Sequence, residues 1–157
     1  MCAIVAGDQG VLATFLPVRS RARVESMLRK RFPDSRLSAA LLPGVVRAFR
    51  SYFDGKPVRF EVRLDLGGVS EFRRRVLEAC RRIPRGQTAS YADLARAAGS
   101  ANAMRAVGST MANNPLPLIV PCHRVVRSDG TLGGFSSPEG VLLKRRLLEL
   151  EGARPPR

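Results

Sequence analysis

Residues 90–112 have the sequence SYADLARAAGSANAMRAVGSTMA. Ser90 is a residue type that commonly caps a helix, and it predicts a short helix over residues 91–98. Gly99 follows at the position where a left-handed backbone often ends a helix. A second helix is predicted over residues 102–112, and the Asn-Asn-Pro sequence after it ends that helix. Two short helices joined by a glycine-containing turn indicate a helix-turn-helix, although any α-rich domain can contain such a pair.

The second of these helices carries mainly small side chains. Ala106, Gly108 and further alanines lie along it, and Arg105 is its one large cation. A helix that contacts base edges in the major groove usually presents polar side chains. Small side chains allow close approach to a narrower groove, which indicates minor-groove contact and recognition of DNA shape. A solvated arginine on a surface helix is the alternative explanation of Arg105.

The first part of the chain shows both strand and helix patterns. Apolar runs at residues 3–5 and 11–15 flank a Gly-Asp-Gln-Gly sequence, which predicts a hairpin. Apolar residues at helical spacing predict one helix that ends at Pro33 and another over residues 45–53. Residues 58–66 alternate between apolar and charged side chains, which predicts a half-buried strand.

A glycine pair after this segment predicts a domain boundary. The expected fold class is α+β, with a small α/β lobe over residues 1–68 and a mostly helical domain over residues 69–157. Ser70 caps the first predicted helix of the second domain. A short buried strand or extended run is predicted at residues 118–120, and a last helix over residues 138–150.

The chain is strongly basic. It contains 27 Lys and Arg and 13 Asp and Glu, a formal net charge of +14, and both halves are basic. Such an excess indicates an anionic partner, either nucleic acid or an anionic membrane surface, unless it only reflects an arginine-rich proteome. No apolar run approaches the ~20 residues of a membrane span, and the N-terminus does not resemble a signal peptide. We therefore expect a cytoplasmic protein that does not contact membranes.

Cysteine and histidine usage excludes two further classes. Three cysteines, Cys2, Cys80 and Cys122, are an odd number, which argues against a disulfide framework. Cys80 lies on an apolar helical stripe and is predicted to be a core residue. A single histidine and the absence of a CxxC motif argue against a structural zinc site.

The segment Pro121-Cys122-His123-Arg124-Val125-Val126 combines a thiol with the only imidazole of the chain. Its proline and β-branched residues predict a rigid, extended backbone. A thiol must lose its proton to attack, and a nearby imidazole can accept that proton. Adjacent side chains point apart on an extended chain, so we expect a water to bridge Cys122 and His123. Glu149 or Glu151 would polarise the imidazole, whereas a structural cysteine beside a surface histidine is the alternative.

Two neighbouring segments are candidates to support this cysteine. Asn114 lies before Cys122, and either it ends a helix by bonding to its own backbone or it holds the cysteine loop through side-chain hydrogen bonds. Residues 133–136, Gly-Gly-Phe-Ser, predict a loop with exposed N–H groups that is either a lid or a simple turn.

Pro121-Cys122-His123-Arg124-Val125 resembles the active-site motif of the O6-alkylguanine-DNA alkyltransferases, also called methylated-DNA–protein-cysteine methyltransferases. Further matching motifs follow the family's order and spacing through residues 70–152. They are Ile83-Pro84-Arg85-Gly86, Ser90-Tyr91, Arg105-Ala106-Val107-Gly108, Asn114-Pro115 and Leu150-Glu151-Gly152. The N-terminal part resembles the RNase H-like α/β lobe of the family.

The resemblance implies catalytic roles for four residues. Cys122 would accept the alkyl group from O6 of guanine in one irreversible step. His123 would act as a base through a water, and Glu151 would orient it. Tyr91 would donate a proton or hydrogen bond to the leaving guanine.

The resemblance also implies a DNA-binding set and a pocket set. Arg105 would fill the gap left by the extruded nucleotide, and the helix that carries it would enter the minor groove. The DNA-binding set is Arg105, Ala106, Gly108 and Ser90. The pocket and loop-bracing set is Asn114, Val125, Phe135 and Ser136, in which the carbonyls of Cys122 and Val125 would bind the exocyclic amine and the Ser136 N–H would face O6.

The implied partner is double-stranded DNA that contains O6-alkylguanine. The resemblance implies a monomer without an obligate protein partner. The transfer, which ends in a thioether, would require neither a cofactor nor a metal ion. Met104, Ser109 and Thr110 differ from the residues usual in the family.

The alternatives to a repair enzyme are a non-catalytic alkyl-lesion binding module and a helix-turn-helix transcription factor. The retained Cys122 argues against the first, and the small-residue helix argues against the second.

Overall fold

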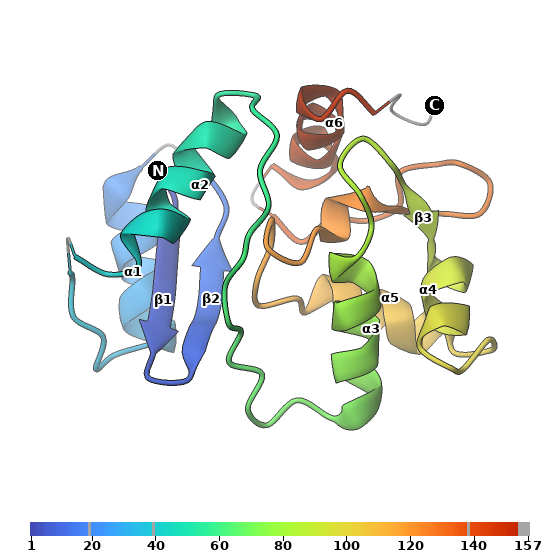
Figure 1. Cartoon of the computed structure of the whole chain (residues 1–157), viewed down its shortest axis with the longest axis horizontal. Helices are drawn as coiled ribbons and strands as arrows, with labels where there is room; N and C mark the ends of the chain where they lie inside the picture. The colour runs from blue at the N-terminus through green and yellow to red at the C-terminus, as the bar shows by residue number, and fades with distance from the viewer. Residues whose placement is uncertain (19, 39, 138, 154–157) are drawn as a thin grey trace. The chain divides into compact units, whose positions relative to one another are not determined.

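The computed structural model describes residues 1–18, 20–38, 40–137 and 139–153 (Figure 1). The chain divides into two compact units, Met1–Asp65 and Leu66–Arg157. The sequence predicts this boundary after residue 68. The mixture of helices and strands expected from the sequence is confirmed. Within the described residues, every helix is too short or too polar to cross a membrane.

The first unit contains a hairpin and two helices. Strands β1 (Ala3–Gly7) and β2 (Gly10–Phe15) pair in antiparallel register, and helices α1 (Arg21–Arg31) and α2 (Pro43–Phe53) follow. All four elements were expected. Phe32 of the α1 C-terminus packs edge-on against Phe15 of β2, with ring centroids 6.4 Å apart. This contact closes a small apolar core between the hairpin and α1.

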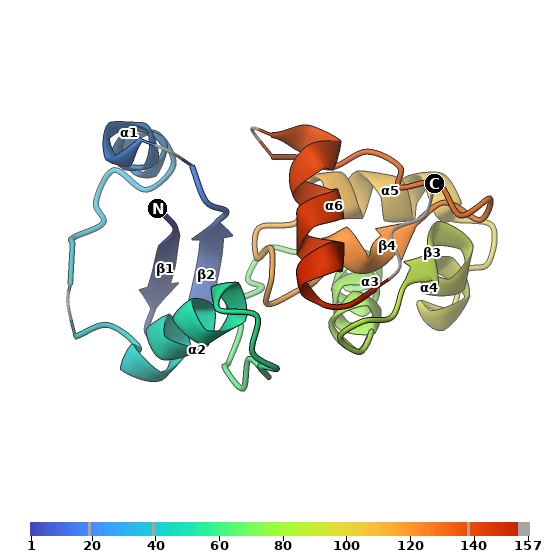
Figure 2. The ribbon, with the colours of Figure 1, turned by 90° about the horizontal axis from the view of Figure 1, so that it is seen from above.

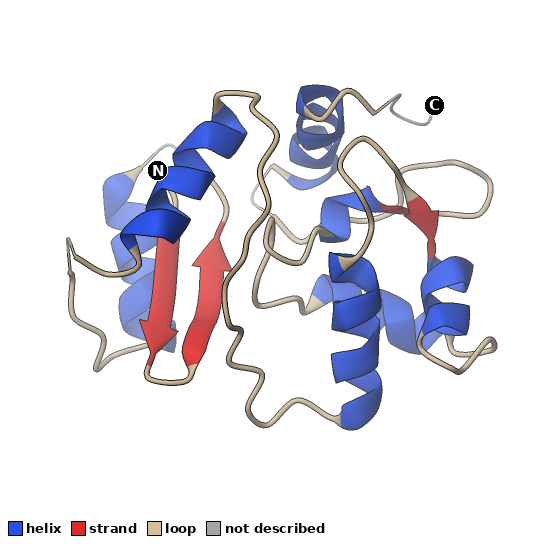
Figure 3. Ribbon diagram, viewed as in Figure 1, coloured by secondary structure: helices blue, strands red, loops and turns tan. Residues whose placement is uncertain are grey.

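The predicted strand over residues 58–66 is wrong. Figure 3 shows loop along this segment, although its side chains alternate between half-buried and exposed as predicted. Its backbone pairs with the hairpin at one bridge, in which Val11 N donates to the Arg63 carbonyl (2.9 Å) and Asp65 N donates to the Val11 carbonyl (2.9 Å). The Arg63 side chain also donates to Gln9 Oε1 in the hairpin turn (2.9 Å). Phe60 instead packs on an aromatic ring of α2. The alternation thus determined which side is buried but not whether a partner strand is present.

Gly10 explains why this bridge forms where it does. A Cβ atom at this position would lie 2.4 Å from the Arg63 carbonyl oxygen, and φ of Gly10 is +132°. Only glycine allows that backbone approach without strain.

The second unit is mostly helical. It contains, in chain order, α3 (Glu71–Arg81), β3 (Ala89–Ser90), α4 (Tyr91–Ala97), α5 (Met104–Ala112), the 3-10 turn η1 (Cys122–Arg124), β4 (Val125–Val126) and α6 (Gly140–Leu150). Strands β3 and β4 lie side by side in parallel (Figure 2). Helices α3, α4 and α5 pack against one another. Cys80 of α3 is fully buried, as predicted, and the predicted start of the last helix at Pro138 lies outside the described residues.

Helices α4 and α5 form the predicted pair. Ser90 begins α4 with a capping box, in which its Oγ accepts from Asp93 N and the Asp93 carboxylate accepts from Ser90 N. Gly99 ends the helix with φ of +76°. Helix α5 begins at Met104, two residues later than predicted, because the chain first makes a turn closed by Ala103 N and the Ser100 carbonyl (2.9 Å). The use of this pair as a DNA-binding helix-turn-helix stays a prediction.

Two backbone predictions near the cysteine are wrong. Residues 118–120 form a buried turn rather than a strand, in which Leu118 has φ of +74° and Val120 N donates to the Leu116 carbonyl (2.8 Å). Nearby prolines lack the N–H that a strand ladder needs. The backbone at Cys122–Arg124 is helical rather than extended, because Arg124 N donates back to the Pro121 carbonyl (2.9 Å).

Candidate active site

Cys122 lies in the wall of a cavity of about 290 Å³ in the second unit. The cysteine is 8% exposed and is the first residue of the η1 turn. The cavity is lined by Tyr91, Gly108, Met111, Ala112, Cys122, Gly134, Phe135 and Ser136. Five residues of the predicted site therefore meet around one space: Tyr91, Gly108, Cys122, Phe135 and Ser136.

His123 and Glu151 form a buried pair beside this cysteine. The distance from His123 Nε2 to Glu151 Oε1 is 2.8 Å, and their side chains are 1% and 0% exposed. Glu151 is the C-cap of α6, whereas Glu149, the other candidate, is exposed. The geometry therefore selects Glu151 as the carboxylate that faces the imidazole.

Arg124 holds the opposite side of the same carboxylate. Its Nε donates to Glu151 Oε2 (2.8 Å), and its Nη2 donates to Glu151 Oε1 (2.8 Å). Its Nη1 donates to the carbonyl of Ile83 (2.6 Å). Two-pronged arginine–carboxylate contacts are the strongest and most directional of side-chain ion pairs. Arg124 therefore keeps the Glu151 carboxylate ionised and fixed in place, a role that sequence reasoning missed.

This arrangement determines which imidazole nitrogen is basic. An ionised carboxylate only accepts hydrogen bonds, so Nε2 of His123 carries the proton that points to Glu151. Burial lowers the pKa of His123, and the hydrogen bond and charge of Glu151 oppose that shift. The imidazole is therefore neutral near pH 7, and Nδ1, the nitrogen turned away from Glu151, is the one that can accept a proton.

The Cys122 thiol is protonated in the resting site. Burial raises its pKa, while a hydrogen bond from the Asn114 side chain and the positive charge of Lys144 lower it. Because burial is the largest of these effects, the free thiolate is a minor form at neutral pH. Attack by Cys122 would thus need a base, and the neutral imidazole next to it in sequence is a candidate for that role.

Asn114 lies between the end of α5 and the loop that leads to Cys122. Its Nδ2 donates to the Val120 carbonyl (2.8 Å), and its Oδ1 accepts from Leu116 N (3.0 Å). The amide therefore bonds to both arms of the turn that precedes Cys122. Both explanations offered for Asn114 have a counterpart here: the Leu116 bond is the local backbone bond, and the Val120 bond corresponds to the tether.

Lys144 is a buried cation that sequence reasoning missed. The residue is 0% exposed, and its Nζ donates to the carbonyls of Val125 (2.6 Å) and Leu132. Burial lowers its pKa to about 8. The sequence contained a signal of this burial, because Lys144 lies three residues before Leu147 and four before Leu148, on the apolar stripe of α6. The Val125 carbonyl, which the resemblance names as an acceptor for the exocyclic amine of guanine, therefore already accepts a hydrogen bond from Lys144. A carbonyl oxygen has two lone pairs, so it can accept a second hydrogen bond.

Tyr91 presents its phenol at the edge of the cavity. Burial raises its pKa, and the neighbouring Cys122 adds to that shift, so the hydroxyl keeps its proton and can donate. A Cβ atom at Gly133 would lie 3.2 Å from the Tyr91 Oη, and φ of Gly133 is +67°. Glycine at this position thus leaves room for the phenol.

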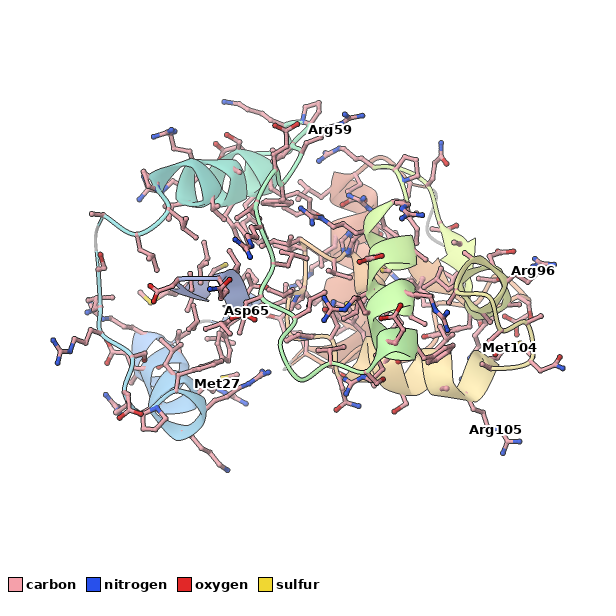
Figure 4. All side chains as sticks on the ribbon, turned by 60° about the horizontal axis from the view of Figure 1, so that its bottom comes forward. Met27, Arg59, Asp65, Arg96, Met104 and Arg105 are labelled. Atoms are coloured by element: carbon pink, nitrogen blue, oxygen red, sulfur yellow. The ribbon has the colours of Figure 1, made fainter. Side chains whose placement is uncertain are left out.

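The predicted DNA-binding residues lie on the surface of α4 and α5. Arg105 and Ala106 are exposed, and Figure 4 shows the Arg105 side chain extending away from the neighbouring helices. Gly108 lies on the same helix and is half-buried. Ser90 differs from the others, because its hydroxyl is already engaged with the Asp93 carboxylate (2.7 Å) in the helix cap. Met104, where the sequence departs from the family, is half-exposed beside Arg105.

Comparison with known proteins identifies the family. The family described as "6-O-methylguanine DNA methyltransferase, DNA binding domain" matches residues 71–153. A methylated-DNA–protein-cysteine methyltransferase of Methanothermobacter thermautotrophicus is 39% identical over 150 residues, 95% of this chain and 78% of the relative. A protein of the same name from Sulfolobus acidocaldarius is 47% identical over 104 residues, 66% of this chain and 63% of the relative.

Solved structures agree with this assignment. The crystal structure of Mycobacterium tuberculosis OGT in complex with DNA has a TM-score of 0.77 and 32% identity, covering 99% of this chain and 88% of that one. The O6-methylguanine-DNA methyltransferase of Pyrococcus kodakaraensis has a TM-score of 0.68 and 28% identity, covering 98% of this chain and all of that one. The chain belongs to the methylated-DNA–protein-cysteine methyltransferase family. The family and enzyme class expected from the sequence are thereby confirmed.

Proposed function

We propose that this protein repairs double-stranded DNA by transferring an alkyl group from O6 of guanine to its own Cys122. The observation that carries the proposal is the position of the Cys122 thiol in the wall of a cavity with the His123–Glu151 pair beside it. A cavity of about 290 Å³ is at the lower end of the range for small-molecule pockets, ~300–1,000 Å³, and suits a single base. The same proposal includes a monomer that acts in the cytoplasm without a cofactor or metal ion.

The lesion enters the cavity as an extruded nucleotide. O6 lies within the stacked, paired base, so the Cys122 sulfur cannot align behind the alkyl carbon in intact duplex DNA. Helices α4 and α5 would act as the helix-turn-helix, with the small exposed side chains of α5 against the minor groove. Arg105, which extends from α5, would occupy the vacated position in the stack.

The chemical step is a single displacement. The Cys122 proton passes through a water to Nδ1 of His123, and Glu151 stabilises the imidazolium that forms. The sulfur attacks the alkyl carbon, a new C–S bond forms, and the C–O6 bond breaks with its electron pair going to guanine. Tyr91 donates a hydrogen bond to the guanine as negative charge develops on it. The imidazolium of His123 then releases its proton, which passes through water to neutralise the guanine, and the thioether on Cys122 ends the activity of that molecule.

Mass spectrometry tests the proposal directly. Purified protein is incubated with duplex DNA that carries one O6-methylguanine, and the intact protein and its peptides are then weighed. We expect one added methyl group per chain, located on the peptide that contains Cys122, and none in Cys122→Ala. Cys80→Ala is the matched control, because Cys80 is buried outside the cavity lining, and it should still gain the methyl group. Methyl transfer to Cys122→Ala would refute the assignment of the nucleophile.

The alternatives predict other results from the same experiment. A non-catalytic lesion-binding module would bind the O6-methylguanine duplex tightly without any change in mass. A helix-turn-helix transcription factor would show neither methyl transfer nor a preference for the lesion. The neutral imidazole and the tethered thiol favour the transferase over both.

A further inference from the structure

A second hollow of about 540 Å³ adjoins the active-site cavity. The two spaces share three wall residues, Tyr91, Gly108 and Gly134. The rim of the second hollow is exposed to solvent and carries two arginines, Arg105 and Arg127. A base that occupies the inner cavity remains joined to its sugar and phosphates, and these must pass across the shared wall. A nucleotide that entered the inner cavity across this shared wall would leave its sugar and phosphates in the outer hollow.

Arg127 is held at this rim by a tight turn. Its N–H donates to the Thr131 carbonyl (2.9 Å), and its carbonyl accepts from Gly130 N (3.0 Å). A Cβ atom at Gly133 would lie 3.5 Å from Arg127 Cγ and 3.2 Å from the Tyr91 Oη. The aliphatic part of the Arg127 side chain thus passes Gly133, close to the phenol of Tyr91, which lines both the cavity and the outer hollow.

The guanidinium of Arg127 is available for a ligand. In the described part of the chain it forms no ion pair, in contrast to Arg124, which is committed to Glu151. Asp129 also lines the hollow and opposes an anion there, but its carboxylate accepts from Thr131 N (2.8 Å) and Thr131 Oγ1 (2.7 Å) and so stabilises the turn. Arg105 is the other cation of the hollow, and the proposed function places it in the base stack.

We propose that Arg127 binds a backbone phosphate of the lesion-bearing strand next to the extruded nucleotide. The inference rests on the proposed function, because it requires that a nucleotide enters the inner cavity. A guanidinium is suited to this contact, since its planar set of donors matches two phosphate oxygens. By holding the backbone at the rim, Arg127 favours the extruded conformation over the stacked one.

The first test compares Arg127→Gln with Arg127→Lys and with Arg145→Gln, which removes an exposed arginine from α6 outside both spaces. We expect Arg127→Gln to weaken binding to an O6-methylguanine duplex about tenfold at low salt, the loss of one charge-assisted contact. The slope of log K against log salt should become shallower by about 0.9 for one lost phosphate contact. Arg127→Lys should keep the wild-type slope. With free O6-benzylguanine, which has no phosphate, the loss caused by Arg127→Gln should be much smaller than with the duplex, and Arg145→Gln should react with both substrates at the wild-type rate.

The second test locates the phosphate. A neutral methylphosphonate replaces, one at a time, each phosphate that flanks the lesion. Wild type should lose affinity at one of these positions, and Arg127→Gln should lose no further affinity there. Equal losses for wild type and Arg127→Gln at every position, or a salt slope unchanged by Arg127→Gln, would overturn the inference while leaving the proposed function intact. A wild-type protein that gains no alkyl group from either substrate would overturn the proposed function, and this inference with it.

Discussion

The imidazole of His123 and the carboxylate of Glu151 lie 2.8 Å apart although 28 residues separate them in the chain. One residue belongs to the η1 turn and the other ends α6, so the pair forms only when both elements are in place. Arg124 adds two hydrogen bonds to the same carboxylate. The residue proposed as the base is therefore also part of the core of the second unit.

Replacement of the carboxylate should destabilise the fold as well as slow the reaction. Glu151→Gln leaves the Arg124 guanidinium partly buried without its counter-charge, and breaking a buried ion pair in this way costs about 3–5 kcal/mol. Urea unfolding measures this loss. Glu149→Gln changes an exposed residue two positions earlier and should alter the free energy of unfolding by less than about 0.5 kcal/mol. Equal stability of the two variants would contradict the role given to Glu151.

The titration of His123 can be followed without interference, because the chain contains one histidine. We expect its imidazole NMR signals to titrate below pH 6.5, since burial lowers the pKa. Between that pKa and 6.5 the unfolded chain binds a proton that the folded chain does not, so this group reduces stability as the pH falls below 6.5. Glu151→Gln should lower the pKa further. An imidazole already charged at pH 7 would rule out the neutral base.

The thiol of Cys122 should remain protonated at neutral pH. Thiolate absorbance near 240 nm, taken as the difference between wild type and Cys122→Ala, should appear only at alkaline pH because burial raises the pKa. Asn114→Ala removes a hydrogen bond that lowers this pKa, so its transition should lie higher still. A difference signal that is complete by pH 7 would mean that the resting protein holds a thiolate.

Lys144→Met should loosen the cysteine loop while keeping most of the side-chain volume. Each buried carbonyl that loses its hydrogen-bond donor costs about 1–3 kcal/mol of stability, and Lys144 donates to the carbonyls of Val125 and Leu132.

The stabilisation by Lys144 should also depend on pH. Between pH 8 and 10.5 the unfolded chain keeps the lysine proton that the folded chain releases, so the free energy of unfolding of the wild type rises with pH. Urea unfolding at pH 7 and pH 10 should therefore show a larger difference between wild type and Lys144→Met at pH 10. A difference that shrinks at pH 10 would contradict this sign.

Arg105→Ala should separate base extrusion from chemistry. Repair of O6-methylguanine in duplex DNA should slow about tenfold or more, since the variant cannot offset part of the extrusion cost of a few kcal/mol. The rate with free O6-benzylguanine should stay unchanged, because no base is extruded. Rapid-quench kinetics with both substrates gives the comparison, and equal slowing of the two would count against this role.

Sequence patterns predicted the helices of both units and the hairpin because each depends on local spacing and capping. They failed for residues 58–66, 118–120 and 122–124, where the backbone depends on partners far away in the chain or on proline positions. The resemblance named five of the eight residues that line the cavity. It did not reveal Lys144 or the clamp of Arg124 on Glu151, because a charged residue in a sequence looks solvated until its burial is known.

Helix α6 has a consequence for how this protein can change over evolution. Lys144 and Glu151 are seven residues apart, about two helical turns, so one face of a single rod holds both the cysteine loop and the base. Inserting or deleting one residue between them would rotate one away from its partner. The length of this stretch is therefore fixed. Diversification of substrate range would then arise by side-chain replacement in the cavity wall, with the spacing inside the helix kept constant.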